Sequence, residues 1–148
     1  MKSTIEFYIL DYLGFGEQTS VGSSNWLSID EATWKRGLGF TDTAGLSLHL
    51  RDRLMRRNDI GKLPASIQIE LEERHTDNVR RTHAMVQEFV ELNRLLQGAD
   101  IRYLNLKGLL LVPAFVERLE RRAQYDYDFL VKKEDLQRAY TLFLQSGY

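Results

Sequence analysis

The chain has 148 residues, with 20 basic and 21 acidic side chains and a formal net charge of −1. This length suits one domain, or one domain with an appendage, and the balanced charge argues against a dedicated nucleic-acid binder. The absence of cysteine excludes disulfides, cysteine-ligated zinc and thiol catalysis, and it makes a cytoplasmic location the expectation. No run of about 18 apolar residues is present, so no membrane partner is expected.

Three regions are predicted along the chain: a lead-in over residues 1–27, a helical region over 28–98 and a partial core of strands and helices over 99–148. The lead-in is rich in glycine and serine, which is typical of loops. One short ordered segment is expected in it, near Ile5 to Leu13.

The helical region contains signals for three helices. Ser28 opens a Ser-Ile-Asp-Glu sequence, which has the form of a capping box, and this first helix is expected to stop near Gly37 and Gly39. A second helix fits residues 43–57, where leucines recur every four positions. A long third helix is predicted over residues 64–97, with the proline in its first turn.

The C-terminal third reads as helix, strand, helix, strand, helix. Strands are predicted over residues 101–106 and 126–131, and helices over 109–119 and 134–145. Two strands joined by a helical crossover should lie side by side, and parallel or mixed pairing is open to them. The predicted fold class is therefore α+β.

Two carboxylates stand one residue apart at the head of the second predicted strand. Side chains alternate across a strand, so Asp126 and Asp128 should share one face while Tyr127 and Phe129 occupy the other. Adjacent like charges repel unless a positive group lies between them. A hard divalent cation fits this position, because Mg²⁺ takes oxygen ligands and is commonly bound by one or two carboxylates plus substrate phosphates.

An ordered series of features around this pair resembles the uncharacterised nucleotidyltransferase family of the polymerase-β-like superfamily. The series consists of a strand ending in Leu106-Lys107-Gly108, then Arg122, then the Asp-x-Asp strand, and a helix that ends in Gly147-Tyr148. The similarity extends over roughly Trp26 to Tyr148. It implies that the C-terminal region is the start of a nucleotidyltransferase-like mixed sheet behind a helical N-terminal region.

The resemblance also implies roles for individual residues. Asp126 and Asp128 would be the catalytic carboxylates and the Mg²⁺ ligands. Lys107 and Gly108 would lie beside the triphosphate of an NTP, and Arg122 would contact phosphate or pair with one of the aspartates. Each residue also has an ordinary structural explanation. The two aspartates could lie on a solvated strand edge, and Lys107 could be an exposed lysine in a turn that needs glycine. Arg122 could be one member of a solvated run of charged residues.

Two features depart from the family pattern. Tyr125 precedes the first aspartate, where the family usually has a small hydroxyl residue. Superfamily members usually carry a third carboxylate on a later strand, and this chain ends at Tyr148. We therefore infer a truncated protein, or a short relative that lacks part of the active site.

Three functional hypotheses follow. The first is a nucleotidyltransferase that moves a nucleoside monophosphate from an NTP to an acceptor, which could be a small molecule, a protein or an RNA. The second is a catalytically incomplete binding or regulatory module, whose unpaired sheet edge would allow a homodimer. The third is an RNA-binding helical domain that uses the basic face formed by Arg51, Arg53, Arg56 and Arg57.

Overall fold

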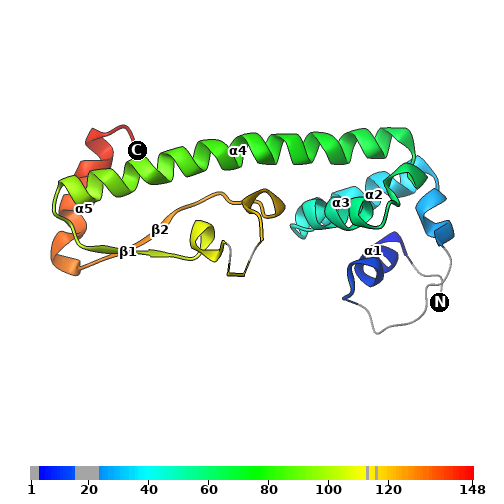
Figure 1. Cartoon of the computed structure of the whole chain (residues 1–148), viewed down its shortest axis with the longest axis horizontal. Coiled ribbons are helices and arrows are strands. Elements are labelled where there is room, and N and C mark those ends of the chain that lie inside the picture. The colour runs from blue at the N-terminus through cyan, green and yellow to red at the C-terminus, as the bar shows by residue number, and fades with distance from the viewer. Residues whose placement is uncertain (1–3, 16–23, 113, 116) are drawn as a thin grey trace. The chain divides into compact units, whose positions relative to one another are not determined.

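The computed structural model describes residues 4–15, 24–112, 114–115 and 117–148 (Figure 1). The chain forms two compact units, Met1–Asn78 with Arg121–Ala123, and Val79–Glu120 with Gln124–Tyr148. Helices predominate and one two-stranded sheet lies near the C-terminus, so the predicted α+β class is confirmed. The predicted region boundaries after residues 27 and 98 stay a prediction.

The first unit is helical. It contains α1 (Ile5–Leu13), α2 (Glu31–Thr43), α3 (Ser47–Arg56) and the first part of α4 (Ala65–Gly98). Short 3-10 turns occupy Ser24–Ser28 and Ile60–Lys62. The ordered segment expected near Ile5 to Leu13 is therefore the helix α1, and the long helix expected from residue 64 is α4.

Two tryptophans lie at the centre of the first unit. The ring centroids of Trp26 and Trp34 are 5.4 Å apart, and the Trp34 indole Nε1 donates a hydrogen bond to the carbonyl oxygen of Leu27 at 3.1 Å. Trp34, Leu50 and Leu54 are completely buried. The leucines that recur every four residues in α3 therefore supply the apolar face that the sequence predicted.

The start and the course of α2 differ from the prediction. The helix is capped by Asp30, whose side chain accepts a hydrogen bond from the Thr33 amide at 2.9 Å, and not by Ser28. It also passes through both glycines that were expected to stop it. A Cβ on Gly37 would lie 2.7 Å from Ile5 Cγ1, so this glycine permits close packing of α1 on α2.

A carboxylate network joins three segments of the first unit. The Nε and Nη2 atoms of Arg74 each donate to the Asp42 carboxylate at 2.8 Å, and the Ser47 hydroxyl donates to it at 2.5 Å. These hydrogen bonds favour the ionised form, so they hold the pKa of the Asp42 carboxyl below its ordinary value, with Arg74 as the main cause.

The lowered pKa of Asp42 predicts a pH-dependent contribution to stability. A carboxyl with a lowered folded-state pKa stabilises the fold above its unfolded pKa of 3.8, and this contribution is lost as the pH falls through the folded value. The substitution Asp42→Asn should therefore cost about 1 kcal/mol or less at pH 7, because the side chain is 43% exposed, and should cost less near pH 2. Urea unfolding at both pH values measures this. Asp100→Asn is the control. The prediction would be contradicted if the difference in unfolding free energy between wild type and Asp42→Asn were the same at pH 7 and near pH 2.

The second unit is built on a two-stranded sheet. Strand β1 (Tyr103–Leu106) pairs with β2 (Asp128–Val131) in antiparallel register, with Leu106 opposite Asp128 and Leu104 opposite Leu130. The last part of α4 and the helix α5 (Leu136–Gln145) complete the unit. The sequence left the strand direction open, and the structure shows it to be antiparallel.

One face of this sheet is packed and the other is exposed. Tyr103, Phe129 and Val131 pack against a small core that contains Leu96, Ile101 and Ala139. Because side chains alternate along each strand, the neighbours Leu104 and Leu130 point the opposite way, and they are 63% and 53% exposed.

The segment between the strands is the largest departure from the prediction. In the described residues of this segment, 3-10 turns at Gly108–Leu111 and Leu119–Arg121 stand where a helix over residues 109–119 was predicted. Val112 is extended, with φ −96° and ψ 137°. A residue before proline is forced toward this region, and Pro113 follows Val112, so the helical pattern is interrupted there.

The second strand is also shorter than expected, since it begins at Asp128 and not at Asp126.

In the residues that the structure describes, no helix has the combination of length and apolarity required to span a membrane.

Candidate functional site

The end of β1 and the beginning of β2 bring a lysine and a carboxylate together. Leu106, the last residue of β1, is opposite Asp128, the first residue of β2, and Lys107 follows directly. The Lys107 Nζ lies 3.6 Å from the Asp128 Oδ2. The lysine side chain is 75% exposed, so this ion pair adds little stability and the amine is free to reorient toward another anion.

The turn after β1 has an unusual backbone. Lys107 has φ 50° and ψ −151°, and Gly108 has φ 50°. Such a combination at a residue with a Cβ costs on the order of 1–3 kcal/mol and is concentrated at functional sites in proteins. The Lys107 carbonyl accepts a hydrogen bond from the Leu110 amide at 3.0 Å, which closes the turn.

Gln124 joins this turn to the first aspartate. Its side chain is 9% exposed, and its Nε2 donates to the Asp126 carbonyl oxygen at 2.6 Å and to the Asp126 Oδ1 at 3.2 Å. A Cβ on Gly108 would lie 2.6 Å from the same nitrogen. The positive φ therefore favours glycine at position 108, and a Cβ there would displace the Gln124 amide from its present position.

The hydrogen bond from Gln124 also explains the late start of β2. The Asp126 carbonyl is paired with a side chain and not with β1, so the strand ladder begins two residues later. Sequence reasoning did not single out Gln124. Its only sequence signal is its position two residues before Asp126, and a single amide residue in a polar connection carries no recognisable pattern.

The residues between and after the aspartates, Tyr127 and Phe129, anchor this segment to α4. The Tyr127 hydroxyl donates to the Met85 carbonyl at 3.1 Å and to the Glu88 carboxylate at 2.5 Å. Phe89 stacks on both Tyr127 and Phe129, with centroids 6.0 Å apart in each case. Burial and the Glu88 carboxylate raise the pKa of the Tyr127 hydroxyl, which therefore stays protonated as a donor.

The remaining predicted residue, Arg122, is placed differently. It is exposed and belongs to the first compact unit, whereas Lys107, Gly108, Asp126 and Asp128 all belong to the second. The adjacent Arg121 pairs with Asp52 of the first unit at 3.2 Å. The group that the structure brings together is thus Lys107, Gly108, Asp128, Asp126 and the additional residue Gln124, and the role of Arg122 stays a prediction.

The acidic pair offers two carboxylates to a cation. Within the described part of the chain, no group of three or more His, Cys, Asp or Glu side chains is arranged to hold a metal ion. Two carboxylates fit the way in which Mg²⁺ is commonly held, with substrate phosphates and water completing its six oxygen ligands. The donor chemistry of Asp126 and Asp128 is therefore compatible with Mg²⁺ bound together with a nucleotide.

The basic face predicted over residues 51–57 lies on α3 and at its C-terminal end. Most of its arginines contact other side chains of the first unit. Arg51 pairs with Glu72 at 2.6 Å, Arg56 pairs with Asp52, and the Arg57 guanidinium lies 4.9 Å from the centroid of the Tyr12 ring. These contacts favour the interpretation of this face as an ordinary charged helix surface over an RNA-binding surface.

Comparison with known protein families places the chain in one of them. Residues 30–148 match the family model described as uncharacterised nucleotidyltransferase, which covers most of the chain. Neither the curated proteins nor the solved structures yielded a match.

Proposed function

Because the chain belongs to the uncharacterised nucleotidyltransferase family, we propose that it takes part in the transfer of a nucleoside monophosphate from an NTP to an acceptor, with Mg²⁺ held by Asp126 and Asp128. The observation that carries the proposal is Gln124, which is almost completely buried between the Lys107–Gly108 turn and Asp126. It connects two segments that are 18 residues or more apart in the sequence and that the resemblance assigns to one phosphate site.

The acidic pair would hold the cation that the reaction needs. Two carboxylates are close enough in the chain to hold Mg²⁺, which when bound offsets the negative charge of the phosphates during the displacement. The nucleophilic atom of the acceptor forms a bond to the α-phosphorus, the bond to the bridging oxygen breaks, and pyrophosphate leaves. The proton lost by the acceptor passes to solvent.

The turn after β1 supplies the phosphate contacts in this proposal. The exposed amine of Lys107 lies near Asp128 and can turn to a phosphate oxygen when a nucleotide is present. Gly108 lets the backbone approach the phosphate closely because it carries no side chain. Gln124 is a positioning residue, since it contacts Asp126 and occupies the space beside Gly108. Arg122 is proposed as a further phosphate contact.

The test of this function is nucleotide binding by the chain as it exists. Isothermal titration with each of the four NTPs is expected to show binding in Mg²⁺ and much weaker binding in EDTA, because the acidic pair repels a nucleotide that is not accompanied by a cation. An absence of NTP binding in Mg²⁺ would contradict the proposal.

A second candidate is a nucleotide-binding or regulatory module without transferase activity. Such a module would use the exposed apolar face of the sheet, with Leu104 and Leu130, as its interaction surface. Pyrophosphate release distinguishes the two candidates. Mg²⁺-dependent NTP binding without pyrophosphate release, across a panel of small-molecule, protein and RNA acceptors, would favour the module.

A further inference from the structure

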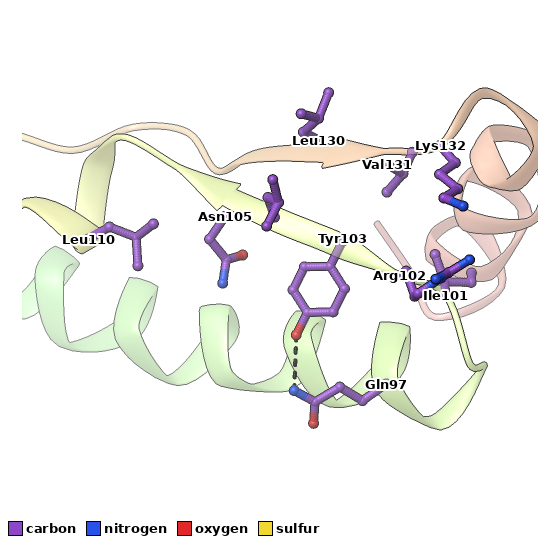
Figure 2. A pocket seen from close by; sticks show the side chains of 10 residues that line it. Gln97, Ile101, Arg102, Tyr103, Asn105, Leu110, Leu130, Val131 and Lys132 are labelled. Carbon is purple, nitrogen blue, oxygen red and sulfur yellow. Dashed lines mark hydrogen bonds between the residues drawn. The ribbon is translucent and has the colours of Figure 1, made fainter.

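A groove runs along β1 in the second unit and is lined by residues from both faces of the sheet, Tyr103 and Val131 as well as Leu104 and Leu130. Its volume is about 910 Å³, which is within the usual range for small-molecule sites. Figure 2 shows Leu110 at one end of the groove and Arg102 and Lys132 at the other. The groove lies entirely within the second unit.

The walls of the groove are apolar and exposed. Leu104, Leu110 and Leu130 all line it, and their side chains are 63%, 49% and 53% exposed. On the side of β1 that faces α4, Tyr103 is held by a hydrogen bond from the Gln97 amide to its hydroxyl at 3.0 Å (Figure 2). The walls therefore offer apolar contact area to a ligand, over a strand that is fixed to α4.

The charged residues that line the groove are of one sign. Arg102 and Lys132 are both exposed, and none of the described residues that line the groove is acidic. Among the described residues, neither of these two cations has an ion-pair partner. The end of the groove near α5 is therefore complementary to an anionic group, because two cations with no neighbouring carboxylate attract a negative charge.

Strand β2 links the groove to the candidate functional site, because Leu130 lines the groove and Asp128 lies two residues before it in the same strand. Asp128, Leu130 and Lys132 are alternate residues of an extended segment, so they share one face of the sheet. At about 3.3 Å per residue, Asp128 and Lys132 lie roughly 13 Å apart along it. A molecule of ordinary metabolite size held by its anionic end at Lys132 would reach Asp128 with its other end.

We propose that this groove binds the acceptor of the transfer reaction, as a small molecule with an apolar body and one anionic group. The apolar body lies on Leu104, Leu110 and Leu130, the anionic group lies between Arg102 and Lys132, and the nucleophilic atom is directed to the Asp128 end. The assignment of the ligand as the acceptor rests on the proposed function, whereas its chemistry rests on the groove alone.

Octane-1-sulfonate is a probe with this chemistry, and the neutral octan-1-ol and the cationic octyltrimethylammonium are its matched controls. Amide chemical shifts of the ¹⁵N-labelled chain, followed during titration, report both the affinity and the location of binding. We expect octane-1-sulfonate to shift residues 102–105 and 130–132 and to bind at least about fivefold more tightly than either control, because charged hydrogen bonds contribute to this ligand alone. Equal binding of the cationic probe would overturn the proposal.

Matched variants separate the groove from the general surface. Arg102→Gln with Lys132→Gln should weaken octane-1-sulfonate about fivefold or more, whereas Arg94→Gln with Lys133→Gln, which removes two exposed cations outside the groove, should not. Leu130→Asn should weaken it, whereas Leu144→Asn should not, although the two leucines are 53% and 54% exposed. Equal effects of a groove variant and its control would show non-specific binding and overturn the proposal.

Nucleotide binding distinguishes the failure of this inference from the failure of the proposed function. Saturating Mg²⁺ and NTP should leave octane-1-sulfonate bound, and displacement would assign the groove to the nucleotide and overturn the acceptor assignment. A chain that binds NTP but not octane-1-sulfonate contradicts the groove alone. A chain that binds octane-1-sulfonate but no NTP contradicts the proposed function, and with it the assignment of the ligand as an acceptor.

Discussion

Replacing Asp126 and Asp128 together by asparagine is expected to abolish the Mg²⁺-dependent part of NTP binding. Asparagine keeps the size of each side chain but removes two negative charges, and a neutral amide oxygen is a much weaker Mg²⁺ ligand than a carboxylate. Loss of a single outer-shell partner typically lowers metal affinity about 10- to 100-fold, so the loss of both proposed ligands should lower it at least about 100-fold. Isothermal titration of wild type and variant with the best-bound NTP, in Mg²⁺ and in EDTA, measures the Mg²⁺-dependent part of the NTP affinity.

The control for this variant removes the same number of charges elsewhere in the second unit. Asp100→Asn with Glu134→Gln changes two exposed acidic residues that are not part of the candidate site, and asparagine tolerates the positive φ of 52° at position 100. The control should bind NTP as the wild type does. Wild-type affinity in the Asp126→Asn, Asp128→Asn variant would show that the pair is an ordinary solvated strand edge.

The second large effect is expected from Gly108→Ala. The new methyl group would lie 2.6 Å from the Gln124 Nε2, so the amide would have to leave the Asp126 carbonyl and carboxylate. We expect a loss of stability of about 1–2 kcal/mol from the positive φ alone. In addition, we expect NTP affinity in Mg²⁺ to fall about 2- to 10-fold, because a hydrogen bond that orients a proposed metal ligand is lost. Urea unfolding and isothermal titration measure the two effects.

The chain offers a matched control for the backbone contribution. Gly45 also has a positive φ, of 69°, but a Cβ there would meet no atom within 4 Å. Gly45→Ala should therefore lower stability by a similar amount while leaving NTP affinity unchanged.

A double-mutant cycle tests the contact between Gly108 and Gln124 directly. Gln124→Ala should weaken NTP binding on its own, and Gly108→Ala should then cause little further loss of affinity, because the clash has been removed. Additive effects of the two substitutions on affinity would contradict a shared role, whatever their effects on stability.

Local patterns in the sequence were sufficient for most of the helices. The leucines of α3, the long apolar stripe of α4 and the amphipathic C-terminal helix were predicted, because helix periodicity is a property of neighbouring residues. The caps and interruptions were harder. Asp30 and not Ser28 caps α2, because its carboxylate accepts the hydrogen bond of the Thr33 amide. Gly37 lies within the helix because Ile5 packs closely against it.

The site divides in the same way. The sequence by itself determined the residue types and their order, since Lys107, Gly108 and the Asp-x-Asp pair are adjacent in short motifs that carry a family resemblance. Only the tertiary structure decided the antiparallel pairing that sets Leu106 opposite Asp128, the role of Gln124 and the groove beside β1. These features depend on contacts between segments distant in the sequence, and such contacts follow from packing and strand register, which no local pattern encodes.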